Sequence, residues 1–172
     1  MRVIRMCALV ALVTSRPLSA QSTNAPQANA IANDSAFAAM QERGRKAMGV
    51  DQYTSSHRFD ALPNGGRIRL VRDKIDSAGV AQIRAHIREI ARAFESGDFS
   101  TPSFVHMQTV PGTSVMRAKR AAITYEPRDL PRGAELVIRT KDRDALNAIH
   151  QFMAFQRQEH HAEGSSGAMT HQ

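Results

Sequence analysis

The strongest constraint on the fold is a pair of alternating segments joined by a glycine-rich turn. In residues 53–62 and 67–73, apolar and polar side chains alternate, which is typical of half-buried β-strands. Asn64, Gly65 and Gly66 lie between them, and these residue types accept the positive φ angles of tight hairpin turns. The sequence therefore predicts an antiparallel hairpin.

A long amphipathic helix is predicted directly after this hairpin. Residues 76–96 begin with Asp76 and repeat apolar side chains three and four positions apart, which is the spacing of one helix face. Gly97 is a typical residue at a helix end. The stripe expected to face the core consists of Val80, Ile83, Ile87, Ile90 and Phe94.

The same order occurs again in the second half of the chain. Residues 122–127 and 134–140 are predicted strands, and residues 142–160 are a predicted helix with Asp142 as its cap. This order predicts an α+β fold, in which two long helices lie on one face of an antiparallel sheet of four or five strands. It is consistent with a duplicated ββα unit, and equally with convergence on a common layout.

Shorter segments surround these two units. Residues 35–49 are predicted to form a short N-terminal helix that ends at Gly49. Between the units, residues 103–110 are predicted to be extended, and residues 114–122 to form a short helix.

The N-terminus has the pattern of a secretory signal peptide over residues 1–20. Arg2 and Arg5 precede a short apolar run, and Ala20 is a small residue suited to cleavage. The apolar run is too short to span a membrane as a helix. The pattern predicts export to the periplasm or the medium, and no integral membrane segment after the signal is removed.

The remaining chain divides into three parts. Residues 21–34 are small and polar and are predicted to be a disordered leader, and residues 162–172 a flexible tail. Residues 35–161 are predicted to form a single domain.

Composition argues against nucleic acid as a partner. Three of the 23 basic residues lie in the signal, so 20 Lys and Arg face 16 Asp and Glu, a net charge of +4. This charge, spread over the domain, is an ordinary solvated surface. With no Trp and only two Tyr, stacking platforms for bases are also scarce. The single cysteine, Cys7, lies in the signal, so neither a disulfide nor a thiolate metal site is expected.

Histidine is the residue type that most indicates chemistry, with seven copies. His57 shares a strand face with Phe59, His86 lies at the edge of the apolar stripe of its helix, and His106 lies in the predicted extended segment. An inward imidazole requires a hydrogen bond or a metal ion. We predict that His57, His86 and His106, with Met116 as a soft ligand, bind copper or zinc.

Other side chains could complete this predicted site. His150 and His160 on the last helix, and Met48 near the first, are expected to support the ligands or to replace one of them. The predicted function is an exported metal carrier, buffer or sensor. No catalytic residue and no organic cofactor is predicted, and the sequence does not identify a protein partner.

Two alternatives remain open from the sequence. The open face of the sheet, with Arg58, Arg69, Arg139 and Lys141, could bind an anionic ligand or a partner in the cell envelope without any metal. A small enzyme with a histidine general base is the other alternative; it would require His57 or His106 beside an acid such as Asp51 or Asp98.

Several segments resemble a group of small exported bacterial proteins of no established function. The resemblance spans about residues 40–160 and implies export and a single domain, without implying an activity. Members often carry His-His-Phe where this chain has His57-Arg58-Phe59, so one ligand candidate is missing here. The segments that carry the resemblance are AMGVDQ, His57-x-Phe59, IRAHIREIA, GDFSTP, VPGTSVM and AIHQFMAFQ.

Overall fold

The computed structural model describes residues 25–49, 54–162 and 164. The predicted signal, most of the predicted tail and the segment 50–53 therefore lie outside the described residues. The elements follow one another as α1 (Ala25–Met48), β1 (Ser55–Leu62), β2 (Gly65–Arg72), α2 (Ser77–Ser96), α3 (Ser100–His106), α4 (Thr113–Ala118), the 3-10 turn η2 (Arg120–Ala122), β3 (Ile123–Leu130), β4 (Gly133–Thr140) and α5 (Arg143–Glu159).

The four strands form one antiparallel sheet in the order β1-β2-β4-β3. The α+β prediction and the hairpin prediction are confirmed. Phe59 lies opposite Ile68, and both are buried on the same face of the sheet, as their alternation predicts. Gly65 has a φ of 154°, and a side chain there would collide with the backbone of Ile138 on β4.

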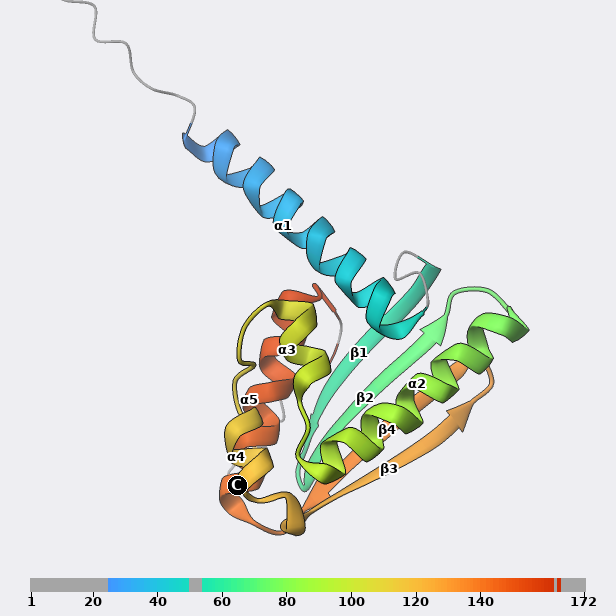
Figure 1. Cartoon of the computed structure of the whole chain (residues 1–172), viewed down its shortest axis with the longest axis vertical. Coiled ribbons are helices and arrows are strands. Elements are labelled where there is room, and N and C mark those ends of the chain that lie inside the picture. The colour runs from blue at the N-terminus through green and yellow to red at the C-terminus, as the bar shows by residue number, and fades with distance from the viewer. Residues whose placement is uncertain (1–24, 50–53, 163, 165–172) are drawn as a thin grey trace, which may run out of the picture.

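The two long helices cover the same face of the sheet (Figure 1). Each helix follows one hairpin in the sequence but packs mainly on the other hairpin. Helix α2 lies against β3 and β4, whereas α5 lies against β1 and β2. All five apolar stripe residues of α2 are buried, and Gly97 ends the helix in a left-handed conformation, as predicted. Asp142 caps α5 by accepting hydrogen bonds from the amides of Asp144 and Ala145.

Helix α1 is longer than the sequence indicated. It begins at Ala25, ahead of the predicted start at Ser35, so it includes part of the segment predicted as a disordered leader. Its first half projects from the body of the molecule, and its C-terminal end packs against α3 and α2 (Figure 1). Arg43 donates a hydrogen bond from Nε to the carbonyl oxygen of Val105 on α3, at 2.7 Å.

The prediction of an extended segment over 103–110 is wrong. Residues Ser100–His106 form helix α3. Asp98 accepts a hydrogen bond from the amide of Ser100 at the start, and Pro102 occupies the first turn, where its missing N–H is tolerated. The helix ends at Met107, which has a positive φ of 54°. Within this helix His106 is buried, as are Pro102 and Val105, and it is only 8% exposed.

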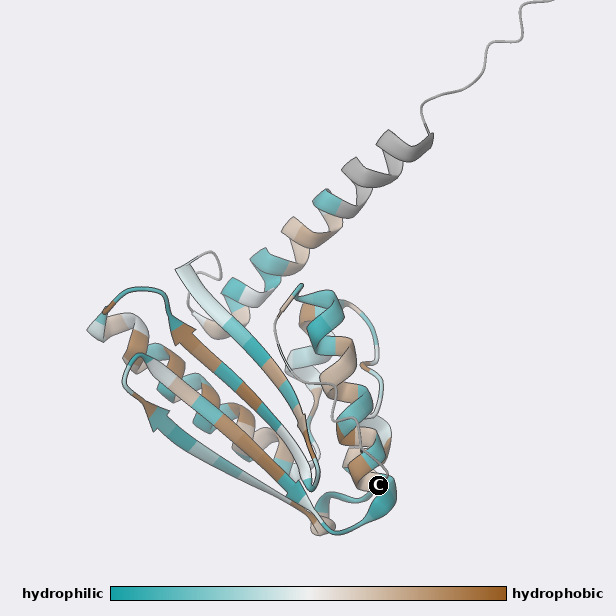
Figure 2. Cartoon of the chain, turned by 180° about the vertical axis from the view of Figure 1, so that it is seen from behind, coloured by the Kyte–Doolittle hydropathy of each residue, from teal (hydrophilic) through white to brown (hydrophobic). Residues whose placement is uncertain are grey.

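Hydrophilic and hydrophobic residues alternate along strands such as β2 (Figure 2), and successive side chains of a strand point to opposite faces, so the face away from the helices carries charged residues. Asp60 is buried there between Arg58 and Arg67, at 3.1 and 2.8 Å. Within the described part of the chain, no helix is long and apolar enough to cross a membrane.

Candidate functional site

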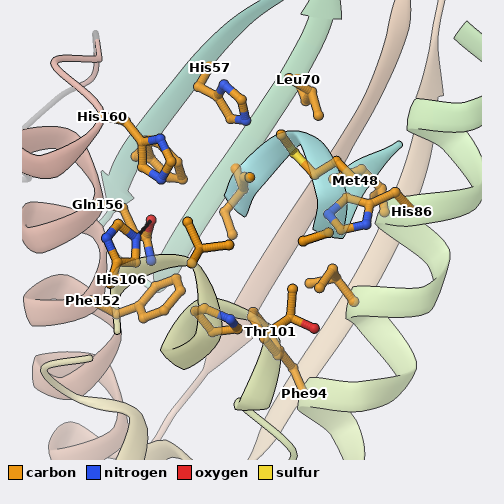
Figure 3. Close-up of a pocket in the computed structure, with 18 residues that line it drawn as sticks. Met48, His57, Leu70, His86, Phe94, Thr101, His106, Phe152, Gln156 and His160 are labelled. Atoms are coloured by element: carbon orange, nitrogen blue, oxygen red, sulfur yellow. Dashed lines mark hydrogen bonds between the residues drawn. The ribbon is translucent and has the colours of Figure 1, made fainter. Parts of the chain in front are cut away.

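A small cavity lies in the gap between α2 and α5. Strands β1 and β2 form its floor, and the end of α1 and helix α3 contribute to its walls. Its volume is about 90 Å³, well below the roughly 300–1,000 Å³ of sites for drug-sized organic ligands. Polar groups reach it from five elements or their ends: His57, His86, Thr101, His106, Gln156 and His160, together with the thioether of Met48 (Figure 3). The remaining walls are mainly apolar.

Three of the imidazoles form one contact group. His57 on β1 stacks with His160 at the end of α5, with ring centroids 5.2 Å apart. His106 on α3 meets the same His160 ring edge-on, with centroids 5.1 Å apart. Residues far apart in the sequence are therefore joined through His160. Phe59 lies beside this group, 5.6 Å from His160.

Gln156 determines which nitrogen of His106 is free. Its side-chain oxygen lies 3.1 Å from Nε2 of His106. Because an amide oxygen only accepts, Nε2 must donate and therefore carries the ring proton. The other nitrogen, Nδ1, then has a lone pair; it is buried and has no hydrogen-bond partner among the described residues. Nδ1 of His160 is likewise buried without a partner in the described structure.

Burial keeps these rings neutral. Desolvation, with a smaller contribution from the nearby His86, lowers the pKa of His57 to about 4. Desolvation also lowers the pKa of His160, with smaller contributions from His57 and His106. The pKa values of His86 and His106 are lowered by burial as well. At neutral pH the cavity is therefore lined by uncharged imidazoles, the form that can donate a lone pair.

His86 and Met48 line another side of the cavity. His86 projects from α2 toward the space in which the other rings lie, and Met48 enters from the end of α1 (Figure 3). Met48 is partly buried and packs against the core. This arrangement puts a thioether and a fourth imidazole at the same cavity.

A larger, more polar hollow of about 490 Å³ adjoins this site. Its lining includes Ser55, Ser56 and Arg69. His57 and His160 line both spaces. Their rings therefore lie between the small apolar cavity and the polar hollow.

The structure brings together most of the predicted site residues. His57, His86 and His106 line one cavity, and so do Met48 and His160, which were predicted as supporting or alternative ligands. The central position of His160 was underestimated, and Gln156 was not predicted at all. The signal for His160 was its spacing of seven residues from the buried Met153, which returns it to the inner stripe of α5.

Two predicted residues do not belong to this cavity. Met116, predicted as a soft ligand, is fully buried in the hydrophobic core and does not line the cavity, because α4 packs against α5 and directs it there. His150 is also absent from the lining. Its Nε2 instead lies 2.9 Å from the carbonyl oxygen of Leu62, at the end of β1. We therefore remove both residues from the candidate site.

The acidic partners required for the enzyme alternative are not found among the described residues that line the cavity. Asp98 is exposed and accepts a hydrogen bond from Ser100, and Asp51 lies outside the described residues. No Asp or Glu among the described residues lines the cavity. In the same part of the chain, no three His, Cys, Asp or Glu side chains are already arranged around one point that could hold an ion. Three imidazoles could share an ion only after side-chain rotation.

The arginines of the open sheet face are already paired with carboxylates. Arg69 lies 3.3 Å from Glu135, and Arg139 lies 2.8 Å from Glu126. An anionic ligand on this face would therefore compete with existing ion pairs.

Comparisons with known protein families, with curated proteins and with solved structures gave no match to this chain.

Proposed function

We propose that the small cavity lined by His57, His86, His106 and His160, called the histidine cavity below, binds a transition-metal ion, copper or zinc. His57, His106 and His160 would supply imidazole ligands, and His86 and Met48 would complete the site from the other side. The observation that carries the proposal is the convergence of four imidazoles on one small, apolar cavity. Neutral imidazole and thioether groups are ligands that suit copper and, for imidazole, zinc.

The unpartnered nitrogens give a physical reason for binding. A buried imidazole lone pair without a hydrogen bond is unfavourable. Nδ1 of His106 is in this state, and Nδ1 of His160 is also buried without a partner among the described residues. A bound cation would satisfy both nitrogens once the proton of the His160 ring is on Nε2. The contact between Gln156 and Nε2 of His106 would orient that ring, as partners of the second nitrogen do in other metal sites.

We further propose that the protein acts outside the cytoplasm, in the periplasm or after secretion, as a carrier, buffer or sensor of the metal. The support for this location is the signal-like pattern of residues 1–20.

Titration of the purified chain with copper and zinc ions tests the proposal. We expect one ion per chain, bound more tightly than about 1 µM. Substitution His160→Ala should weaken binding at least about tenfold, because His160 joins the other rings. His150→Ala is the matched control on the same helix and should retain wild-type affinity. The proposal fails if no metal binds with a dissociation constant below the micromolar range.

A further inference from the structure

We infer that the histidine cavity selects a monovalent soft ion, cuprous copper, over Cu(II) and Zn(II). The inference rests on the proposed function, because it specifies which ion the same site prefers. It is argued from the charge and the chemistry of the lining residues.

The lining of the cavity carries no fixed charge. Among the described residues that form it, none is Asp, Glu, Lys or Arg. Charged groups act from outside the lining: Glu89 on His86, and Glu159 together with Arg43 on His106. Arg58 and Arg69 line the adjoining hollow that shares His57 and His160. The cost of moving an ion from water into an apolar medium grows with the square of its charge. A divalent ion therefore loses far more solvation energy here than a monovalent one, and no carboxylate among the described lining residues compensates for it.

The donor atoms favour the same ion. Met48 contributes a thioether, which is a soft and uncharged ligand. The imidazoles are neutral, and the proton on Nε2 of His106 leaves Nδ1 as its donor atom. Soft, neutral ligands select Cu(I), whereas carboxylates suit harder divalent ions.

The direct test measures affinities of the purified chain for each metal alone. Cu(I) is titrated under anaerobic conditions against a chromogenic Cu(I) chelator, with Ag(I) as a monovalent ion that does not change oxidation state. Zn(II) and Cu(II) are titrated separately. We expect Cu(I) and Ag(I) to bind at least about a hundredfold more tightly than Zn(II). We also expect Cu(I) to bind more tightly than Cu(II). If Zn(II) or Cu(II) binds as tightly as Cu(I), this inference is wrong while the proposed function stands. If no ion binds, both are wrong.

A pair of methionine variants tests the soft ligand. Met48→Leu keeps a similar volume but removes the sulfur, and should weaken Cu(I) and Ag(I) binding about tenfold with little change for Zn(II). Met116→Leu is the matched control, because Met116 is buried away from the cavity. An equal loss of affinity for Zn(II) and Cu(I) in Met48→Leu would overturn the selection by sulfur.

A charge variant tests the electrostatic argument. Gln156→Glu keeps an oxygen near Nε2 of His106 but adds a negative charge beside the cavity. Zn(II) affinity should rise relative to Cu(I) by about tenfold, because the carboxylate compensates for the second positive charge. An unchanged ratio of the two affinities would show that the neutral lining does not determine the selectivity.

Discussion

The side-chain oxygen of Gln156 lies 3.1 Å from Nε2 of His106, and this buried contact joins α3 to the last turns of α5. It connects the segment between the two ββα units to the helix of the second unit. The contact also determines the tautomer of His106, so that the nitrogen without a partner is Nδ1. Gln156 is thus a positioning residue for the candidate site.

Replacing Gln156 by alanine should weaken metal binding. Without the amide oxygen, the His106 ring loses its orientation, and its Nε2–H becomes a buried donor without a partner. We expect a loss of Cu(I) affinity of about 10- to 100-fold and of roughly 1–3 kcal/mol in the free energy of unfolding. Competition titration and urea denaturation measure the two effects, and NMR of the ring nitrogens reports the tautomer.

Gln151→Ala serves as the control for this change. Gln151 is the same residue type on the same helix but is exposed to solvent. It should leave the affinity and the His106 tautomer unchanged. If Gln156→Ala keeps both at wild-type values, Gln156 does not position the ring.

Acidification should destabilise the fold through the buried His106 and the half-buried His57, His86 and His160. A histidine in the unfolded chain has a pKa of about 6.5 and gains a proton as the pH falls below that value. Folded His57 remains neutral until about pH 4. In this window the unfolded chain binds more protons, so the free energy of unfolding falls as pH falls, by about 1.4 kcal/mol per pH unit for His57. His86, His106 and His160 contribute with the same sign, because their pKa values are also lowered. Urea denaturation between pH 7.5 and 4.5 measures the slope.

His57→Gln isolates one contribution to this slope. The variant should lose stability less steeply with acid than the wild type, by up to about 1.4 kcal/mol per pH unit. Gln151→Ala, which changes no titratable group, provides the reference. Parallel slopes in His57→Gln and the wild type would mean that His57 has the same pKa in the folded and the unfolded chain.

The elements with strong periodicity could be predicted from the sequence, and the cavity could not. The alternation around Gly65 and the stripe of α2 depend on local spacing, and the structure confirms both. Helix α3 was missed because its length, Ser100–His106, is too short for a periodic pattern, and its ends depend on Asp98 and on the positive φ of Met107. The inward or boundary positions of His57 and His86 followed from periodicity. The inward position of His106 did not, because its segment was predicted to be extended and is helical, and Phe104, predicted on the same face, is exposed.

Their convergence depended on tertiary packing. Each long helix packs on the other hairpin, which brings the end of α5 beside β1. His160 therefore meets His57, a contact that no sequence spacing indicates. The same packing leaves Met116 in the core, although it follows His106 closely in the sequence.

Two glycine positions should differ in their tolerance of alanine. At Gly66, an added Cβ would lie 2.7 Å from the end of Met153 and 2.9 Å from a methyl group of Ile149 on α5. The flexible end of Met153 can shift, whereas the Ile149 methyl group is attached directly to Cβ and requires a small movement of α5, so we expect a cost of about 1–3 kcal/mol in the free energy of unfolding. At Gly112, φ is 84° and the Cβ would collide with the backbone of Ala148, so Gly112→Ala should cost more.

Urea denaturation of both variants tests this order. Gly49→Ala is a useful reference, because Gly49 has a positive φ of 70° but no atom within 4 Å of its added Cβ. It therefore measures the backbone cost alone. If Gly112→Ala loses no more stability than Gly49→Ala, the close contact between Gly112 and α5 is not a significant constraint.

Metal binding should hold the end of α1 against the domain. Helix α1 packs mainly on α3 and α2, and Arg43 fixes it to the carbonyl oxygen of Val105. Because Met48 and His106 line the same cavity from α1 and α3, an ion bound to both would join the two helices. Hydrogen exchange in residues 44–48 and 101–106 should therefore become slower when Cu(I) is added.

Arg43→Ala provides a second test of this connection. Loss of the hydrogen bond to Val105 should speed exchange at the end of α1 and weaken Cu(I) binding several-fold, since Met48 is then held less firmly. Arg45→Ala, which removes an exposed pair with Glu42 on the same helix, should change neither quantity. If Cu(I) slows exchange near His57 and His160 but leaves α1 at its metal-free rate, the ion is bound by imidazoles alone, and Met48 is not a ligand.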